Sequence, residues 1–520
     1  MKLSEILKYL RVKKFVGDEN VNISGIAYDS REVEEGDLFV AIRGLNVDGH
    51  RFIPEAVLAG AVAVILENDI IDDNYFVERN VAKIVVPDSR KALAVVSSAF
   101  YGFPSKKLKL VGVTGTNGKT TTTHLIKSIL EFGGLKAGLI GTINYVIGDE
   151  IIPAGQTTPE SLELNKFISK MVEKGISACV MEVSSHALAL DRVYELDFDV
   201  GVFTNLTHDH LDFHQTFEAY FQAKKILFDS LKQSAYAVYN IDDPYGEKII
   251  ADTRAEKLSY GRSERADVRI KEFKFGFDGT RVVVQFPNGA ELDINSKLIG
   301  EFNVYNISSA VAVGYALGIE YEDIKRGIEA VENVKGRFEK ITSPDGYTVI
   351  IDYAHTPDAL EKCIDAILKV KEQVGGGRLI TVFGCGGDRD KSKRPIMGKI
   401  STEKSDITVI TSDNPRFEDP EEIISDILEG VKENSVYYVF VDRREAIERA
   451  LEMAEKNDVV LIAGKGHEEY QIIRDVKVPF SDSQVVFEYF CPRTNAIISF
   501  VVVLPLLPAT AITGISKSFL

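Results

Sequence analysis

A segment rich in glycine and threonine, VTGTNGKTTT at 113–122, carries the first chemistry in the sequence. It follows an apolar run and precedes a helical pattern, which predicts a strand, a tight turn and a helix N-terminus. Such a terminus favours phosphate, Lys119 adds a positive charge, and the hydroxyl of Thr120 can ligate Mg²⁺. Val113 stands where the strict phosphate-loop pattern has glycine, so Gly115 takes the tight turn. The pattern predicts a nucleotide site; the alternative is an ordinary turn before a helix.

Two further polar motifs come directly after apolar strands, MEVSSH at 181–186 and TNLTHDHLDFH at 204–214. Open α/β sheets bind ligands at the carboxyl ends of their strands, so both motifs are expected to face the crevice of the phosphate loop. Glu182 and His210 could ligate divalent cations that bridge a nucleotide and its substrate. The alternative is a cluster of histidines that only orders a turn.

A third motif, AYFQAKKILF at 219–228, places Lys224 on a predicted helix. A helical lysine is ordinarily a solvated surface charge. The residues alone therefore assign Lys224 no further role.

The elements that must position these residues divide the chain into three α/β units. In the first, short β-rich runs alternate with helix-like stretches. The second begins with the strand before the phosphate loop and includes a hairpin-like stretch at 266–290, so a mixed sheet is expected. The third alternates apolar strands with amphipathic helices, as a parallel sheet covered by helices requires. The predicted domains are residues 1–90, 91–336 and 337–490. The predicted boundary between the first two lies between residues 90 and 104.

Composition excludes several classes of protein. With 45% hydrophobic and 27% charged residues, the 520-residue chain is neither disordered nor of low complexity. A net charge of −17 argues against a nucleic-acid or anionic-membrane binder. Its four cysteines lie far apart without metal-ligand spacing, and the N-terminal segment has no apolar core of a signal peptide. A cytoplasmic protein is therefore expected.

The last thirty residues, 491–520, differ from the rest. No charged residue lies between Arg493 and Lys517, which raises the question of a membrane anchor. Pro505 and Pro508 disfavour a helix there. A peripheral extension or a segment from an altered reading frame is favoured over an anchor, so the tail receives no function and no membrane is expected to be needed for activity.

Ten separated motifs together resemble the Mur ligases of peptidoglycan synthesis, in order and over about residues 20–487. The motifs are GTNGKTT, EVSSH, TNLTHDHLDFH, AYFQAKK, GEFNVYN, KGRFE, DYAHTPD, FGCGGDRD, SDNPR and AGKGHE. The resemblance implies an ADP-forming acid–amino-acid ligase that uses ATP and Mg²⁺. It also implies a small N-terminal α/β domain for a uridine nucleotide, a central P-loop mononucleotide-binding α/β domain and a C-terminal Rossmann-like α/β domain.

The resemblance also assigns roles to residues at matching positions. Lys224 matches a lysine that is carbamylated in the family, so catalysis would use Lys119, carbamylated Lys224, Glu182 and His210. The metal ligands would be Thr120, Glu182, His210 and the carbamate of Lys224. ATP would be bound by Gly115, Thr116, Asn117, Gly118, Lys119, Thr120, Thr121, Asn303, Asn306, Arg337 and Asp352.

Within the family, the motifs resemble the ligase that adds the third residue of the stem peptide. UDP-N-acetylmuramoyl-L-alanyl-D-glutamate (UDP-MurNAc-L-Ala-D-Glu) would be bound by Ser30, Asn46, Thr157, Thr158, Ser184 and Arg192. Leu190 stands where some members carry glutamine, so one polar contact with this substrate is in doubt. The amino-acid pocket would consist of Arg389, Asp413, Asn414, Pro415, Arg416, Gly464 and Glu468. We expect a monomer with these small-molecule substrates.

The identity of the added amino acid depends on Arg416. Its guanidinium can pair bidentately with a distal carboxylate, which meso-diaminopimelate has and L-lysine lacks. Diaminopimelate is therefore predicted, with L-lysine as the alternative. Outside this reaction, the alternatives are a P-loop ATPase that drives movement and a nucleotide-sugar binding module without turnover. Within the family, the rivals are the folate-adding synthetase and the ligases of the first, second and fourth stem steps.

Overall fold

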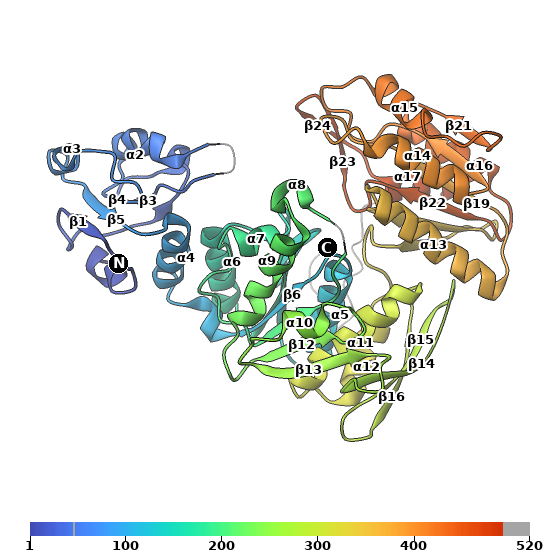
Figure 1. Cartoon of the computed structure of the whole chain (residues 1–520), viewed down its shortest axis with the longest axis horizontal. Coiled ribbons are helices and arrows are strands. Elements are labelled where there is room, and N and C mark those ends of the chain that lie inside the picture. Colours follow the sequence, from blue (N-terminus) through green and yellow to red (C-terminus); the bar gives the residue numbers. More distant parts are fainter. Residues whose placement is uncertain (45–46, 208, 492–520) are drawn as a thin grey trace, which may run out of the picture.

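The computed structural model describes residues 1–44, 47–207 and 209–491 (Figure 1). Its strands form three large sheets, each with its own helices, and one two-stranded ribbon. The predicted three-domain α/β fold is confirmed. Within the described ranges, no helix is long and apolar enough to cross a membrane. Asn46 and the apolar tail from 492 onward lie outside the described residues.

The N-terminal sheet has five strands in the order β1-β5-β4-β3-β2, parallel except for β1. One face packs against α1 and α4, and the other against α2 and α3. The helix α4 packs into this core. This packing favours residue 104, the upper limit that the sequence predicts for the first domain boundary. The position of that boundary stays a prediction. The elements are α1 (Leu3–Leu7), β1 (Lys14–Val16), β2 (Ile26–Ala27), η1 (Ser30–Glu32), β3 (Leu38–Val40), η2 (Gly49–Phe52), α2 (Ile53–Ala59), β4 (Ala63–Leu66), α3 (Asp73–Val77), β5 (Ala82–Val85), α4 (Ser89–Phe100) and η3 (Pro104–Lys107).

The central sheet has eleven strands in the order β16-β15-β14-β13-β12-β11-β6-β10-β7-β8-β9. Its middle is parallel and both ends are antiparallel, as the expected mixed sheet requires. The elements are β6 (Lys109–Thr114), α5 (Lys119–Phe132), β7 (Ala137–Ile140), β8 (Asn144–Ile147), β9 (Glu150–Pro153), α6 (Ser161–Glu173), β10 (Ala178–Glu182), α7 (Ser185–Ala189), β11 (Val200–Phe203), α8 (Leu211–His214), α9 (Phe217–Asp229), β12 (Tyr236–Asn240), α10 (Gly246–Ile249), β13 (Glu256–Gly261), β14 (Val268–Gly276), β15 (Gly279–Gln285), β16 (Glu291–Ser296), α11 (Glu301–Ala316) and α12 (Tyr321–Glu329).

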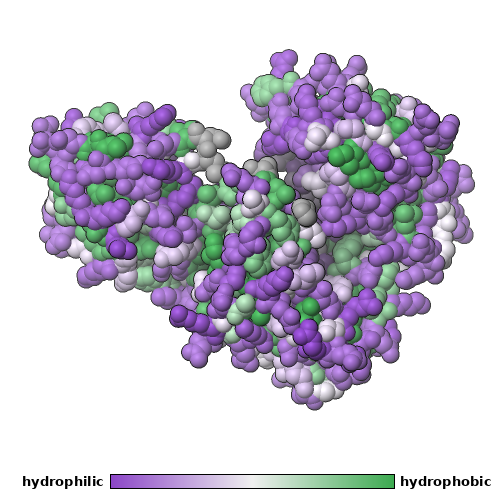
Figure 2. Space-filling model, in the orientation of Figure 1, coloured by the Kyte–Doolittle hydropathy of each residue, from purple (hydrophilic) through white to green (hydrophobic). Residues whose placement is uncertain are grey.

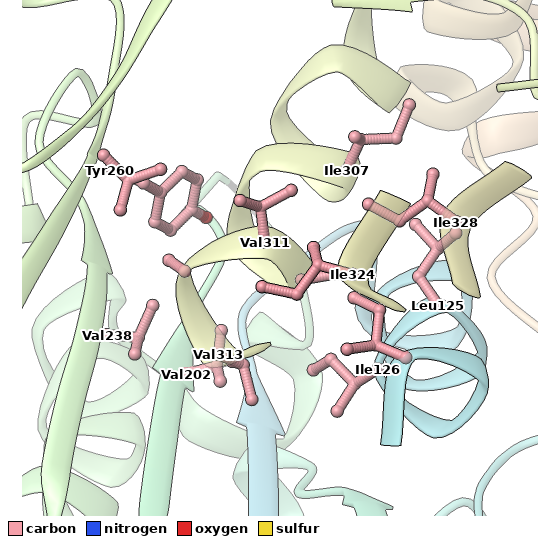
Figure 3. Close-up of a cluster of buried hydrophobic side chains, with 14 of the residues drawn as sticks. Leu125, Ile126, Val202, Val238, Tyr260, Ile307, Val311, Val313, Ile324 and Ile328 are labelled. Atoms are coloured by element: carbon pink, nitrogen blue, oxygen red, sulfur yellow. The ribbon is translucent and has the colours of Figure 1, made fainter. Parts of the chain in front are cut away.

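Alternation along β6 explains how helices cover both faces of this sheet. Val111 and Val113 point into a core with α5, α11 and α12, whereas Leu110 points into a second core with α6 and α9. Figure 3 shows the first core, where Leu125 and Ile126 of α5 meet Ile324 of α12. Apolar burial on both sides fixes the strand ends that carry the polar motifs.

The C-terminal sheet has six strands in the order β17-β18-β22-β19-β20-β21 and is parallel except for β17. One face packs against α13, α14 and α15, and the other against α16 and α17. The elements are β17 (Glu339–Thr342), β18 (Thr348–Asp352), α13 (Pro357–Val374), β19 (Leu379–Phe383), α14 (Lys393–Lys404), β20 (Ile407–Ile410), α15 (Pro420–Leu428), β21 (Tyr437–Val439), α16 (Arg443–Met453), β22 (Val459–Ala463), β23 (Tyr470–Ile473), β24 (Val476–Pro479) and α17 (Asp482–Phe490).

The three domains leave an open hollow on one side of the molecule. Figure 2 shows this hollow above the central domain, between the N-terminal domain on the left and the C-terminal domain on the right. The visible surface around it is largely hydrophilic. The carboxyl ends of β6, β10 and β11 supply the polar motifs of the candidate site.

Candidate active site

The loop between β6 and α5 depends on two glycines with left-handed backbone. Gly115 has a φ of 146° and Gly118 a φ of 87°. A Cβ on Gly115 would lie 1.9 Å from the hydroxyl oxygen of Thr204, and one on Gly118 would lie 2.3 Å from Oδ1 of Asn306. Only glycine fits both places, because the backbone of the loop packs directly against Thr204 and against Asn306 of α11. The loop leads into the N-terminus of α5, where backbone N–H groups favour a phosphate group.

Lys119 begins α5 and bends back over the loop. Its Nζ donates to the carbonyl oxygens of Gly115 at 2.9 Å and Thr116 at 2.8 Å. Burial lowers the pKa of Lys119 below its ordinary value, against the attraction of Glu182 and Asp209. A bound anion would replace these neutral acceptors with a charged partner. Asn117 and Thr121 complete the segment, with Asn117 N–H donating to Asn205 at 3.0 Å.

Glu182 lies at the end of β10 and is only 1% exposed. Its carboxylate accepts hydrogen bonds from the hydroxyl of Thr120 at 3.0 Å and from the backbone and hydroxyl of Thr142 at 2.8 and 3.0 Å. The predicted pairing of Thr120 with Glu182 is therefore present in space. Thr142 was missed, because the turn after β7 carries no recognisable motif.

Lys224 is buried on α9 and is not the surface charge that a helical lysine usually is. Its Nζ donates to the carbonyl of Gly115 at 2.8 Å and lies 4.5 Å from the ring centre of Tyr220. Burial holds the pKa of Lys224 well below its ordinary value, and the positive charge of Lys119 lowers it further. The amine is thereby favoured in its neutral, nucleophilic form.

His210 lies in a ring cluster at the edge of the same region. Its imidazole packs edge-on against His186 with ring centres 4.9 Å apart, and its Nε2 lies 3.4 Å from Asp209. Within the described residues, no group of three His, Cys, Asp or Glu side chains could hold a metal ion. The ring cluster resembles the alternative weighed from the sequence, and the role of His210 as a metal ligand stays a prediction.

The other predicted nucleotide residues come from α11 and the connection to the C-terminal domain. Asn306 accepts from the hydroxyl of Thr122 at 3.5 Å and donates to Asn303 at 2.8 Å. The Arg337 guanidinium lies 5.0 Å from the ring centre of Tyr353, and Asp352 accepts from the backbone of Phe338 at 2.7 Å. Burial raises the pKa of Asp352, and Arg337 opposes this shift.

The residues predicted to bind the dipeptide surround Glu182. Thr158 donates to the backbone oxygen of Glu182 at 2.8 Å and accepts from the backbone of Ser184 at 3.1 Å. Thr157 lies 3.1 Å from the hydroxyl of Thr142. The guanidinium of Arg192 donates to the carbonyl of Thr158 at 3.0 Å. These side chains therefore form one group next to the phosphate loop.

Arg90 connects this group to the N-terminal domain. It pairs with Glu160 at 3.2 Å, and Glu160 also lies 3.5 Å from Arg192. Arg90 further donates to the carbonyls of Arg43 and Leu190. No sequence motif indicated this link, because its partners lie far apart along the chain. Ser30 lies elsewhere in the N-terminal domain, where it donates to Glu55 at 3.3 Å.

A cleft of about 750 Å³ lies between the central and C-terminal domains. Asp209, His210 and Leu211 of the central domain line one side. Six of the seven residues predicted for the amino-acid pocket line the other side: Arg389, Asp413, Asn414, Arg416, Gly464 and Glu468. The seventh, Pro415, is buried behind them, where its carbonyl would lie 1.9 Å from a Cβ on Gly387.

Arg416 adopts a left-handed φ of 53°, which is uncommon for arginine. Backbone hydrogen bonds to Ile472 and from Arg474 hold this conformation. The guanidinium donates to the carbonyl of Gly387 at 2.7 Å, and a Cβ on Gly386 would lie 3.0 Å from it. The glycines of FGCGGDRD thus make room for Arg416. Arg389 lines the same cleft and donates to the backbone of Asp388.

A buried lysine, Lys465, holds two residues of the predicted amino-acid pocket. Lys465 donates to Asn414 at 3.1 Å and to Glu468 at 2.9 Å, and Asn414 donates to the same oxygen of Glu468 at 3.0 Å. Asp413 approaches Gly464 so closely that a Cβ there would lie 2.6 Å from its carboxylate. Lys465 belongs to the motif AGKGHE. Its contact with Asn414 was not predicted, because the two residues lie far apart along the chain.

Three family models match the chain. They are the Mur ligase family catalytic domain at 22–101, the Mur ligase middle domain at 113–314 and the Mur ligase glutamate ligase domain at 336–466. A UDP-N-acetylmuramoyl-L-alanyl-D-glutamate–2,6-diaminopimelate ligase of Clostridium acetobutylicum is 48% identical over 94% of this chain and 99% of its own length. The chain belongs to the Mur ligase family. Another Mur ligase of the same description, from Aquifex aeolicus, is 46% identical over 90% of this chain and 93% of its own length.

Solved structures of Mur ligases have the same architecture. One, a UDP-N-acetylmuramoyl-L-alanyl-D-glutamate–2,6-diaminopimelate ligase, superimposes with a TM-score of 0.67 at 30% identity, covering 94% of this chain and 98% of the other. MurF ligase from Thermotoga maritima in complex with ADP has a TM-score of 0.58 at 21% identity, covering 90% and 97%. The second likeness concerns the fold alone.

Proposed function

We propose that this Mur ligase joins meso-diaminopimelate to UDP-MurNAc-L-Ala-D-Glu with cleavage of ATP to ADP and phosphate. The observation that carries the proposal is the cleft, because it brings Arg389 and Arg416 to face the domain that holds the phosphate loop. The names of the similar ligases support the same substrates. L-Lysine is the alternative amino acid.

The phosphate loop fits the phosphates of ATP. Its two glycines leave no room for side chains, α5 presents its N-terminus, and Lys119 lies over the loop. We assign Asn303, Asn306, Arg337 and Asp352 to the rest of the nucleotide. Thr120 and Glu182 form an oxygen donor set suited to Mg²⁺, which when bound neutralises phosphate charge.

Lys224 is proposed to carry a carbamate. A lysine must be neutral to add carbon dioxide, and burial beside Lys119 favours that form. The product carboxylate would set a negative charge beside the ammonium of Lys119 and so add an attraction between the two side chains. It would also add an oxygen ligand for a second Mg²⁺, with His210 as the proposed neighbouring ligand.

The dipeptide substrate is proposed to lie along the N-terminal and central domains. Ser30 and Asn46 would contact the uridine nucleotide, and Thr157, Thr158, Ser184 and Arg192 the dipeptide. The hydrogen-bonded group around Glu182 supports this proposal, since a dipeptide bound to it would have its terminal carboxylate beside the phosphate loop. Leu190 supplies only its backbone oxygen to Arg90.

The amino-acid pocket supports diaminopimelate by its charges. The guanidinium of Arg416 donates to the neutral carbonyl of Gly387 and can donate instead to a distal carboxylate. That charge-assisted hydrogen bond is stronger than the one it would replace. Arg389 is a second cation in the same cleft. Glu468, held by Lys465 and Asn414, can accept from the distal ammonium. Lysine would leave the two arginines without this partner.

The chemistry follows from the poor reactivity of a carboxylate, which is anionic and lacks a leaving group. The γ-carboxylate of D-glutamate attacks the γ-phosphate of ATP, the bond from that phosphorus to the β,γ-bridging oxygen breaks, and ADP leaves. The product is an acyl phosphate, and Lys119 reduces the repulsion between the two anions. The amine then displaces phosphate. We place this reaction in the cytoplasm and expect a monomer.

Phosphate release from ATP tests the proposal. The enzyme is incubated with UDP-MurNAc-L-Ala-D-Glu, Mg²⁺ and, in turn, meso-diaminopimelate, L-lysine, L-alanine or D-glutamate, and the product is identified by mass. We expect release and a tripeptide product with diaminopimelate. Release without a peptide product, or with every amino acid equally, would support a non-ligating ATPase instead.

A further inference from the structure

We propose that His355 accepts the proton of the incoming amine in the ligation step. This inference rests on the proposed function and deepens it, because it assigns a base within the same cleft. His355 lies between β18 and α13 and lines the cleft together with His210 and Arg416. It therefore faces both the central domain, where the acyl group would form, and the pocket for the amino acid.

The hydrogen bonding of His355 fixes its tautomer. Nδ1 lies 2.8 Å from the carbonyl oxygen of Tyr353. A carbonyl oxygen only accepts, so the hydrogen must be on Nδ1. In a neutral imidazole, Nε2 then carries the lone pair. Among the described residues, none hydrogen-bonds to Nε2 of His355, which leaves that lone pair available to a ligand in the cleft.

The surroundings of His355 favour the neutral ring. The side chain is exposed to the cleft, but protein surrounds it at longer range, and this desolvation lowers the pKa of His355 below its ordinary value. The hydrogen bond to the Tyr353 carbonyl and the charge of Asp413 after β20 raise the pKa of His355, whereas Lys393 on α14 and Arg337 before β17 lower it; desolvation is the largest effect. The other charged or titratable side chains around the cleft are Asp209, His210, Arg389, Asp390, Arg416 and Glu468.

Neighbouring groups are less suited to take this proton. Burial raises the pKa of Tyr353 to about 12, so its phenol stays protonated. Burial and the cation of Arg337 lower the pKa of His467 to about 4, and its Nδ1 is enclosed without a partner among the described residues. Lys393 is a cation that donates to the backbone oxygen of His355 at 2.8 Å. His355 combines a lone pair with access to the cleft.

The step balances as follows. The ammonium of the amino acid gives one proton to Nε2 of His355 and becomes a neutral amine. Its nitrogen lone pair forms the amide bond to the acyl carbon, and the bond from that carbon to the phosphate oxygen breaks with its electron pair. The second proton of the former ammonium passes to the departing phosphate. The imidazolium then releases its proton to water in the open cleft.

The test separates amine deprotonation from acyl phosphate formation. His355→Asn keeps a donor for the Tyr353 carbonyl but has no base at the position of Nε2. We expect kcat with diaminopimelate to fall by about 100-fold, the usual worth of a general base. Hydroxylamine is already neutral at neutral pH, so trapping of the acyl phosphate as a hydroxamate should stay near the wild-type rate. The ligation rate of the variant should recover as pH rises, because free amine becomes more abundant.

A second variant, His355→Ala, tests the proposal in case His355→Asn does not fold. In His355→Ala, imidazole added to the buffer should restore part of the ligation rate. An equal loss of ligation and hydroxamate formation would overturn the proposal, as would a pH profile that both variants share with the wild type. If the proposed function itself were wrong, the wild-type enzyme would form neither product, so the two failures are distinguishable.

Discussion

Lys119 and Lys224 direct their ammonium groups at the same carbonyl oxygen, that of Gly115, from 2.9 and 2.8 Å. Both side chains lie in desolvated surroundings, and each of the two pKa values is below its ordinary value. Two cations this close in a desolvated site would repel, which favours the neutral form of the Lys224 amine. ATP and a carbamate on Lys224 would each supply the missing negative charge.

Replacement of Lys119 by alanine should abolish ligation without loss of the fold. The variant loses the cation that offsets charge in phosphoryl transfer, and we expect kcat to fall by about 100-fold to 1000-fold or more. Stability should be unchanged or slightly higher, because a desolvated cation is removed. ADP release and thermal unfolding check both parts. Near-normal turnover would contradict the assignment of the phosphate loop.

Replacement of Lys224 by arginine should also inactivate the enzyme, because arginine stays protonated and cannot form the carbamate. Lys225→Arg is the matched control, since Lys225 is paired with Asp229 and Asp252 near the surface. Carbon-13 NMR after incubation with labelled bicarbonate should show a carbamate signal in the wild type and in Lys225→Arg, but not in Lys224→Arg. An active enzyme without that signal would argue against the modification.

Glu418 should make the C-terminal domain sensitive to acid. Its hydrogen bond with the buried Arg394, at 2.9 Å, lowers the pKa of Glu418 to about 2. Because the folded-state pKa is depressed, this stability is present above the unfolded-state pKa and is lost as the pH falls from about 4.3 to about 2. We expect a loss of about 2 kcal/mol across that window in the wild type and none of it in Glu418→Gln. Urea unfolding at several pH values measures the difference, and identical curves would refute it.

Much of the fold was predictable because its central strands are apolar on both faces. The strands around Val111, Val180 and Val202, and the helices that cover them, follow directly from their sequence patterns. The short edge strands were not foreseen. β1, β2 and β17 have only two to four residues each, and their pairing is set by tertiary contacts rather than by local pattern.

The site was predictable wherever a motif follows a strand, as for Lys119 and Glu182. Contacts between distant segments were not. Thr142 holds Glu182 from a turn without a motif, and Lys465 meets Asn414 only after the C-terminal sheet has formed. The burial of Lys224 likewise depends on how α9 packs, which a helical pattern with lysines on it does not disclose.

The most direct test of the account is the ratio of kcat/KM for meso-diaminopimelate to that for L-lysine, measured in the wild type and in Arg416→Ala. Lysine would leave Arg416 on the neutral carbonyl of Gly387, and the charge-assisted hydrogen bond that is then not formed is worth about 1.5–3 kcal/mol, so we expect the wild type to favour diaminopimelate by roughly tenfold to 100-fold. Arg416→Ala should lose most of this preference. Equal or better efficiency with L-lysine in the wild type, or an undiminished preference in Arg416→Ala, would contradict the assignment.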